Sequence, residues 1–310
     1  MAGHVEIARA SGWQIERRHP GAVQRVLSAL WQFCRRKPLG AIGGLIIVAL
    51  LVMAAFAEWI APYAYDQSIR NARLRPPGSG FLLGTDNVSR DIFSRIVYGA
   101  RVSVTVGFST VFLATLLATT IGITSGYFGG RYDLVIQRIV DAWQSFPFLV
   151  IVLSLLAVLG PGMLNLILSL SILAAAGASR VIRGATLGVI ANQYVEAARA
   201  IGCGHLRIIL RYILPNVAAT IIILATIGLG GVILAESALA FLGYGVPPPY
   251  PSWGAMLSGS GRTYMYTAPW MALWPGVAIS LAVFGFNMLG DALRDVLDPR
   301  LRGAGSGPLR

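Results

Sequence analysis

The sequence predicts an all-α membrane protein with six transmembrane helices. Of its 310 residues, 55% are hydrophobic and only 12% are charged, whereas soluble domains carry about a quarter charged residues. Six apolar runs come close to the roughly 20 helical residues that are needed to cross about 30 Å of hydrocarbon. The predicted spans are residues 40–60, 103–126, 139–160, 163–179, 219–242 and 272–292.

The chain before the first span is polar, and we expect residues 1–38 to form a cytosolic tail. The first apolar run begins near Leu39, behind a polar stretch longer than the charged region of a cleavable signal peptide. We therefore expect this run to be retained as the first span of a membrane region that covers residues 39–293.

The first outside loop is predicted at residues 61–102. Its PPG and SG pieces indicate turns. From Asp86 onward, Ile92, Ile96 and Val97 recur at helical spacing, which predicts an amphipathic helix leading into the second span.

The later spans contain many small residues, as in GLGGVILAESALAFLG. Glycine, alanine and serine allow helix backbones to approach closely in lipid, so a packed bundle is expected. The long connections are predicted to be a cytosolic loop at 180–218 and an outside loop at 243–271, with a cytosolic tail at 294–310.

The placement of Arg and Lys predicts that both ends of the chain are cytosolic. With this orientation 18 basic residues lie inside and 7 outside, as the positive-inside rule requires. The loop 61–102 opposes the rule, because it holds six of the seven. The reverse orientation would place the segment 180–216 outside, so we keep the N-in, C-in arrangement.

The sequence lacks the residue patterns of an enzyme. His4 and His19 lie in the N-terminal tail and His205 lies in the cytosolic loop, so no span offers a histidine base or a HExxH zinc site. Lys37, the only lysine, is followed by Pro38, which excludes a Walker A loop. We expect no catalytic residue, metal or cofactor in this chain, and any nucleotide-driven work must come from another polypeptide.

The net charge of +12 does not indicate a nucleic-acid partner, because most of the basic residues lie close to predicted membrane ends. Three polar residues within or near the spans are functional candidates, since charge in hydrocarbon is costly. They are Glu236 in the middle of the fifth span, Asp141 at the start of the third and Asn287 in the sixth. Each could line a translocation path or make a polar contact between helices.

The cytosolic segment EAARAIGCGHLRIILRYILPN, residues 196–216, is predicted to form two short helices. Gly202 and Gly204 break the first helix, which presents small alanine side chains. In the second helix an apolar face runs at i, i+3, i+4 and i+7, and Leu214-Pro215 is expected to end it. Such a helix pair favours docking into a groove of a cytosolic partner.

This segment resembles the EAA motif of ABC importer permeases. Further stretches narrow the resemblance: LGTDNVSRDIFSRIVYGARVS, GYFGGRYD, VDAWQSFP, LAESALAFLGYGVPPPYPSWGAML, APWMALWPG and NMLGDALRDVLDPRLR. Together they cover about residues 35–302 and are similar to the C-type subunit of the dipeptide/oligopeptide (peptide/nickel/opine) subfamily. Ser89 stands where this subfamily usually has a glycine.

The resemblance implies the type I importer permease fold in a bacterial cytoplasmic (inner) membrane. It implies a second, B-type permease subunit, cytosolic ABC ATPase subunits that bind ATP and Mg, and an extracytoplasmic substrate-binding protein. The EAA loop would couple this chain to one ATPase. The residues that carry the coupling would be Glu196, Ala197, Ala198, Gly202, Leu214 and Pro215.

Two other classes of protein are possible on the residues alone. An ion-coupled secondary transporter would need paired intramembrane carboxylates or repeated halves, and this sequence has one deep glutamate and no repeat. An intramembrane enzyme would need a nucleophile and a base. Within the resembled subfamily the substrate stays open between dipeptides, longer peptides, glutathione, nickel chelates, opines and oligosaccharides.

Overall fold

The computed structural model describes residues 31, 33–35, 37–78 and 80–297. The chain divides into two compact units, residues 1–38 and 39–310. The predicted cytosolic tail 1–38 lies almost wholly outside the described residues, and so does most of the predicted tail 294–310. The second unit carries the transmembrane helices.

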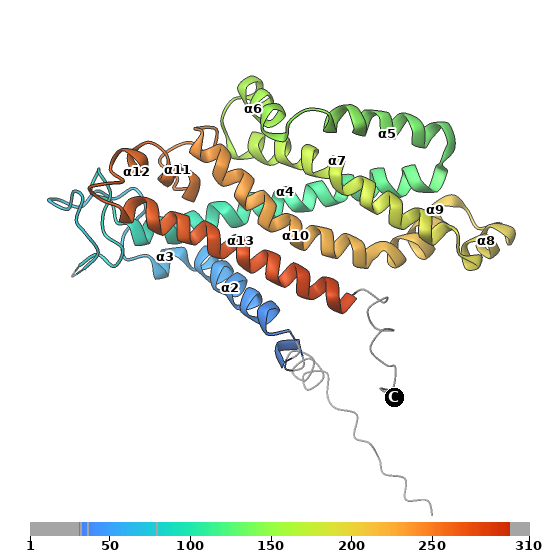
Figure 1. Ribbon diagram of the computed structural model, residues 1–310, viewed down its shortest axis with the longest axis horizontal. Helices are drawn as coiled ribbons and strands as arrows, with labels where there is room; N and C mark the ends of the chain where they lie inside the picture. The colour runs from blue at the N-terminus through green and yellow to red at the C-terminus, as the bar shows by residue number, and fades with distance from the viewer. Residues whose placement is uncertain (1–30, 32, 36, 79, 298–310) are drawn as a thin grey trace, which may run out of the picture. The chain divides into compact units, whose positions relative to one another are not determined.

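Among the described residues, five helices are long and apolar enough to cross a membrane, and a bent helix pair gives a sixth crossing if it counts as one span. The second and third of these five run in the same direction, because the bent pair between them carries the chain back, which can be followed by colour in Figure 1. The predicted all-α membrane fold is confirmed. The five long helices are α2 (Pro38–Ala55), α4 (Ile92–Phe128), α7 (Met163–Ile190), the continuous helix His205–Phe241 and α13 (Trp270–Leu297).

The third predicted span, residues 139–160, is wrong as a continuous helix. The structure has two helices there, α5 (Gly130–Gln144) and α6 (Phe148–Leu159), which meet at an angle of 88°. Pro147 explains the break, because it has no N–H to continue the helix and it disfavours helical geometry at Phe146. Hydropathy alone does not detect the bend, since the apolar run continues through it.

The fourth predicted span ends at residue 179, but α7 continues to Ile190. The added turns carry Arg180 and Arg183, which lower the hydropathy without breaking the helix. Both arginines are bonded to α5: Arg180 pairs with Asp141, and Arg183 pairs with Asp133. The polar end of α7 is therefore stabilised by its neighbour.

The helices α4 and α7 pack closely through small residues. A Cβ added at Gly122 would lie 2.6 Å from the backbone oxygen of Ser179, and one at Gly126 would lie 3.0 Å from Thr186. At the contact of α10 (Leu214–Phe241) with α13, a Cβ added at Gly290 would lie 2.7 Å from Ile227. This is the small-residue packing that the sequence predicts.

Short helices cover one end of this unit: α3 (Ala57–Ile60), α11 (Trp253–Leu257) and α12 (Ser260–Thr263). Trp253 of α11 is fully buried, lies on Gly99 of α4 and donates a hydrogen bond to the Ile96 carbonyl at 3.0 Å. The opposite end carries α8 (Gln193–Ala200) and α9 (His205–Ile208), as Figure 1 shows. The short helices therefore lie at two opposite ends of the unit.

Candidate functional site

The predicted cytosolic loop 180–218 is mostly helical. After α7 ends at Ile190 come α8, a four-residue break, α9, the π-helix η1 (Ile209–Ile213) and α10. Figure 1 shows α8 projecting beyond the long helices, and α9 is the first part of the continuous helix His205–Phe241. The loop is thus an ordered structure that a partner can contact.

Gly202 ends α8 through its backbone. Its φ is +80°, a left-handed conformation that glycine adopts without steric cost. The N–H of Gly202 donates to the Arg199 carbonyl and the N–H of Cys203 donates to the Ala198 carbonyl, both at 3.0 Å, which is the Schellman pattern of helix termination. Gly202 therefore fixes the angle at which the chain leaves α8.

The structure separates the predicted coupling residues into two groups. Glu196 and Ala197 are exposed on α8. Ala198 is buried in an apolar cluster with Val195 and Ile208, so it attaches the loop to its own chain. The EAA triplet thus has an outward part and an inward part.

An exposed apolar tip lies beside the triplet. Ile201 is 78% exposed, Leu206 is 70% exposed, and Leu210 follows on the next turn. The apolar face predicted for the second helix consists of Leu206, Ile209, Leu210 and Ile213, and of these Ile213 is buried. The sequence pattern does not single out Ile201 as an exposed apolar residue. The signal that marks it is its position directly before the helix-ending Gly202.

The expected stop at Leu214-Pro215 is wrong, because the helix runs unbroken from His205 to Phe241. Proline lacks an N–H, but Pro215 lies in the first turn of α10, where an N–H is not required. The preceding residues form η1, in which the Leu214 N–H bonds to the Ile209 carbonyl five residues earlier. The π-helical turn therefore accommodates the proline without a break.

The loop is attached to the end of α4 by aromatic and polar contacts. The Tyr127 hydroxyl and His205 Nδ1 are 2.8 Å apart. The Arg199 guanidinium lies 5.2 Å from the centre of the Tyr127 ring, a cation–π contact. The loop is therefore bonded to α4 as well as continuous with α10.

The three polar candidates lie apart from one another. Glu236 is fully buried and faces Ser237, which donates to it at 3.3 Å. Asp141 is half-exposed and pairs with Arg180 and Arg138. Asn287 lies on α13 opposite Gly230 of α10, where an added Cβ would be 3.1 Å from its oxygen.

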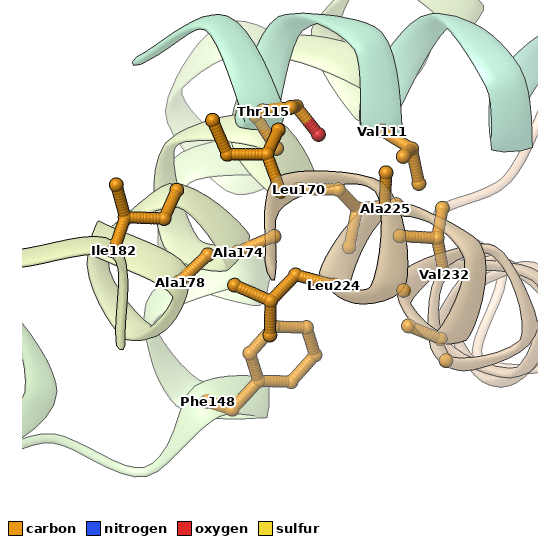
Figure 2. Close-up of a pocket in the computed structure, with 15 residues that line it drawn as sticks. Val111, Thr115, Phe148, Leu170, Ala174, Ala178, Ile182, Leu224, Ala225 and Val232 are labelled. Carbon is orange, nitrogen blue, oxygen red and sulfur yellow. The ribbon is translucent and has the colours of Figure 1, made fainter. Parts of the chain in front are cut away.

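A cavity of about 330 Å³ lies between α4, α7 and α10, with Phe148 of α6 at its edge. Figure 2 shows aliphatic side chains from these helices converging on it. Among the 15 lining residues, Thr115 is the only one with a polar side chain, and neither Glu236, Asp141 nor Asn287 is included. The wall of the cavity is thus almost entirely apolar.

Within the described part of the chain there is no group of three or more His, Cys, Asp or Glu side chains that could hold a metal ion. The fold defines the class of protein, a polytopic membrane protein. A family model described as "Binding-protein-dependent transport system inner membrane component" matches residues 118–303, and a second, "N-terminal TM domain of oligopeptide transport permease C", matches residues 27–77. The chain belongs to the first family, and its N-terminal span has the form found in the second.

Three relatives illustrate the similarity. The dipeptide transport system permease protein DppC of Alkalihalophilus pseudofirmus is 40% identical over 86% of this chain and 88% of its own length. The di/tripeptide permease DppC of Pseudomonas aeruginosa is 38% identical over 90% and 93%. The glutathione transport system permease protein GsiD of Escherichia coli is 38% identical over 92% and 94%.

A solved structure shares the fold. A chain of the MetNI methionine ABC transporter, in an inward-facing conformation, superposes with a TM-score of 0.54 at 20% identity and covers 66% of this chain and 96% of its own length. The resemblance to C-type ABC importer permeases is confirmed. The chain is a non-catalytic, multi-pass subunit of the inner membrane, and ATP hydrolysis belongs to a partner chain. The ion-coupled secondary transporter is not supported.

Proposed function

We propose that this chain is the C-type permease of a peptide importer, which forms half of the translocation pathway and is driven by a separate ATPase. The support comes from relatives that carry dipeptides, di/tripeptides or glutathione, all of which are peptides. The complete importer would contain a B-type permease, ATPase subunits that bind ATP and Mg, and an extracytoplasmic binding protein. The loop with α8 and α9 would face the cytosol, as the distribution of arginines predicts.

The coupling surface in this proposal consists of the exposed residues Glu196, Ala197, Ile201 and Leu206. One observation supports it above all: two large apolar side chains are more than two-thirds exposed on an ordered helical tip. Exposed apolar patches beside polar residues are typical of protein–protein contacts. Ala198, Gly202, Leu214 and Pro215 would then shape and attach the tip rather than touch the partner.

The translocation pathway in this proposal runs past the apolar cavity between α4, α7 and α10 (Figure 2). An apolar wall with small residues binds no side chain strongly, which suits a carrier of peptides with varied sequences. Asp141 and Asn287 would hold helices together instead, because each faces another helix, and Glu236 is bonded within its own helix to Ser237.

The test is the substitution Leu206→Asp in the full transporter. We expect it to weaken capture of the ATPase subunits by roughly 30-fold, since an interface hot spot contributes about 2 kcal/mol or more. Co-purification of the ATPase with tagged permease, followed by ATP hydrolysis, measures the loss. Insertion and pairing with the second permease should stay unchanged.

The matched control is Leu82→Asp. Leu82 is 67% exposed, close to Leu206 in exposure, but it lies in the first predicted outside loop. This variant should retain its ATPase. If Leu206→Asp also retains full ATPase binding, the proposed coupling surface is wrong.

A further inference from the structure

A second cavity, of about 450 Å³, lies at the end of the molecule that carries α11 and α12. Its wall combines the segment before α4 with the loop after α10. Three charged residues line it: Asp86, Arg90 and Arg95. Asp86 and Arg95 are 5% and 8% exposed, so charge is held there largely out of water.

The charges in this cavity do not balance. Asp86 Oδ1 accepts hydrogen bonds from the N–H groups of Val88 and Arg90, and Oδ2 accepts one from Arg90 Nε at 2.7 Å. Arg95 Nε is 3.9 Å from the same Oδ2. One carboxylate thus serves two guanidinium groups, which leaves a net charge of +1.

Several guanidinium donors remain available. Arg95 Nη1 donates to the Tyr65 carbonyl at 2.9 Å. Within the described residues, neither Nη of Arg90 nor Nη2 of Arg95 donates a hydrogen bond. A partly buried cation without a full set of acceptors is costly, so an incoming anion would be stabilised strongly.

The remaining wall of the cavity suits an amphipathic ligand. Tyr250 lines it and stacks on Tyr65, with ring centres 5.6 Å apart. Met256 and Met271 supply flexible apolar contacts, and the run Pro247–Pro249 gives a stiff edge. Apolar and aromatic walls with a few charged groups are typical of a small-molecule site.

We propose that this cavity binds the C-terminal carboxylate of the transported peptide as it leaves the binding protein. The inference rests on the proposed peptide transport. A carboxylate carries the single negative charge that the cavity lacks, and its two oxygens match the planar donor fork of arginine. The apolar wall would receive the last side chain of the peptide.

The experiment uses the complete transporter in proteoliposomes, with the binding protein supplied on the outside. A dipeptide and its C-terminal amide are each given at a concentration that saturates the binding protein, so that the affinity of that protein does not decide the result. We expect wild type to take up the acid about tenfold faster than the amide, as a charge-assisted hydrogen bond implies. Arg90→Gln should lower this ratio towards one, and Arg90→Lys, which keeps the charge without the fork, should retain part of it.

The matched control is Arg70→Gln, which removes the same charge from an exposed position of the same loop and should keep the wild-type ratio. A wild-type ratio of one overturns the proposal without any variant. Equal loss of acid and amide uptake in Arg90→Gln also overturns it, because that pattern indicates a contact with a partner protein. If wild type takes up neither compound, the proposed peptide transport itself is wrong.

Discussion

The sequence and the structure give different reasons why residue 202 is a glycine. As part of the EAA resemblance it was expected to touch the ATPase. In the structure its φ is +80°, and a Cβ added there would have no atom within 4 Å. The left-handed backbone conformation therefore explains the glycine at this position, whether or not a partner protein approaches it.

We expect Gly202→Val to destabilise the loop by roughly 1–2 kcal/mol, because a β-branched residue tolerates the left-handed region poorly. Gly202→Asn should cost much less, since asparagine adopts this conformation more readily. Thermal melting of the assembled transporter measures both. If the Gly202→Asn variant melts at the wild-type temperature but loses the stimulation of ATP hydrolysis, Gly202 also contacts the ATPase.

Ser89 illustrates the same point in the first predicted outside loop. Its φ is +66°, so a residue that differs from the usual glycine keeps the left-handed conformation that glycine would provide. The departure from the subfamily pattern changes the side chain and leaves the turn in place.

At the scale of elements, the backbones of α4 and α7 approach each other closely at Gly122. We expect Gly122→Ala to destabilise the assembled transporter by about 1–3 kcal/mol, because its methyl group would meet the backbone of α7 at Ser179. The melting temperature of the purified complex measures this effect.

Gly184→Ala is the matched control for that substitution. Gly184 lies inside α7, and a Cβ added there would have no atom within 4 Å. This variant should be neutral or slightly stabilising, since alanine favours the helix. Equal destabilisation by both substitutions would show that close backbone approach is not the cause.

The elements also show which features a sequence can predict. Hydropathy located every long helix, because crossing a membrane requires apolar length. It missed the bend at Pro147 and the continuity through Pro215, because a proline breaks one helix but is accommodated by a π-helical turn in the other. The EAA segment was located, but the burial of Ala198 depends on α9 and η1 folding back onto α8.

At the scale of the whole molecule, the apolar cavity predicts where transport can be blocked. Ala174→Phe should fill much of its volume and lower peptide uptake at least tenfold, with ATPase assembly retained. Uptake into proteoliposomes and co-purification measure the two properties. Ile172→Phe, at an exposed position of the same helix, is the control and should transport normally.

The unbroken helix from His205 to Phe241 connects the end that carries the exposed apolar tip with the end that carries the second cavity. Its 37 residues span about 55 Å at 1.5 Å per residue. It begins beside the exposed tip at Leu206 and ends next to Gly243 and Gly245, which line the cavity with the two arginines. A rigid helix of this length would act as a lever: a tilt of about 5° about the end that carries Leu206 would displace the other end, beside that cavity, by about 5 Å.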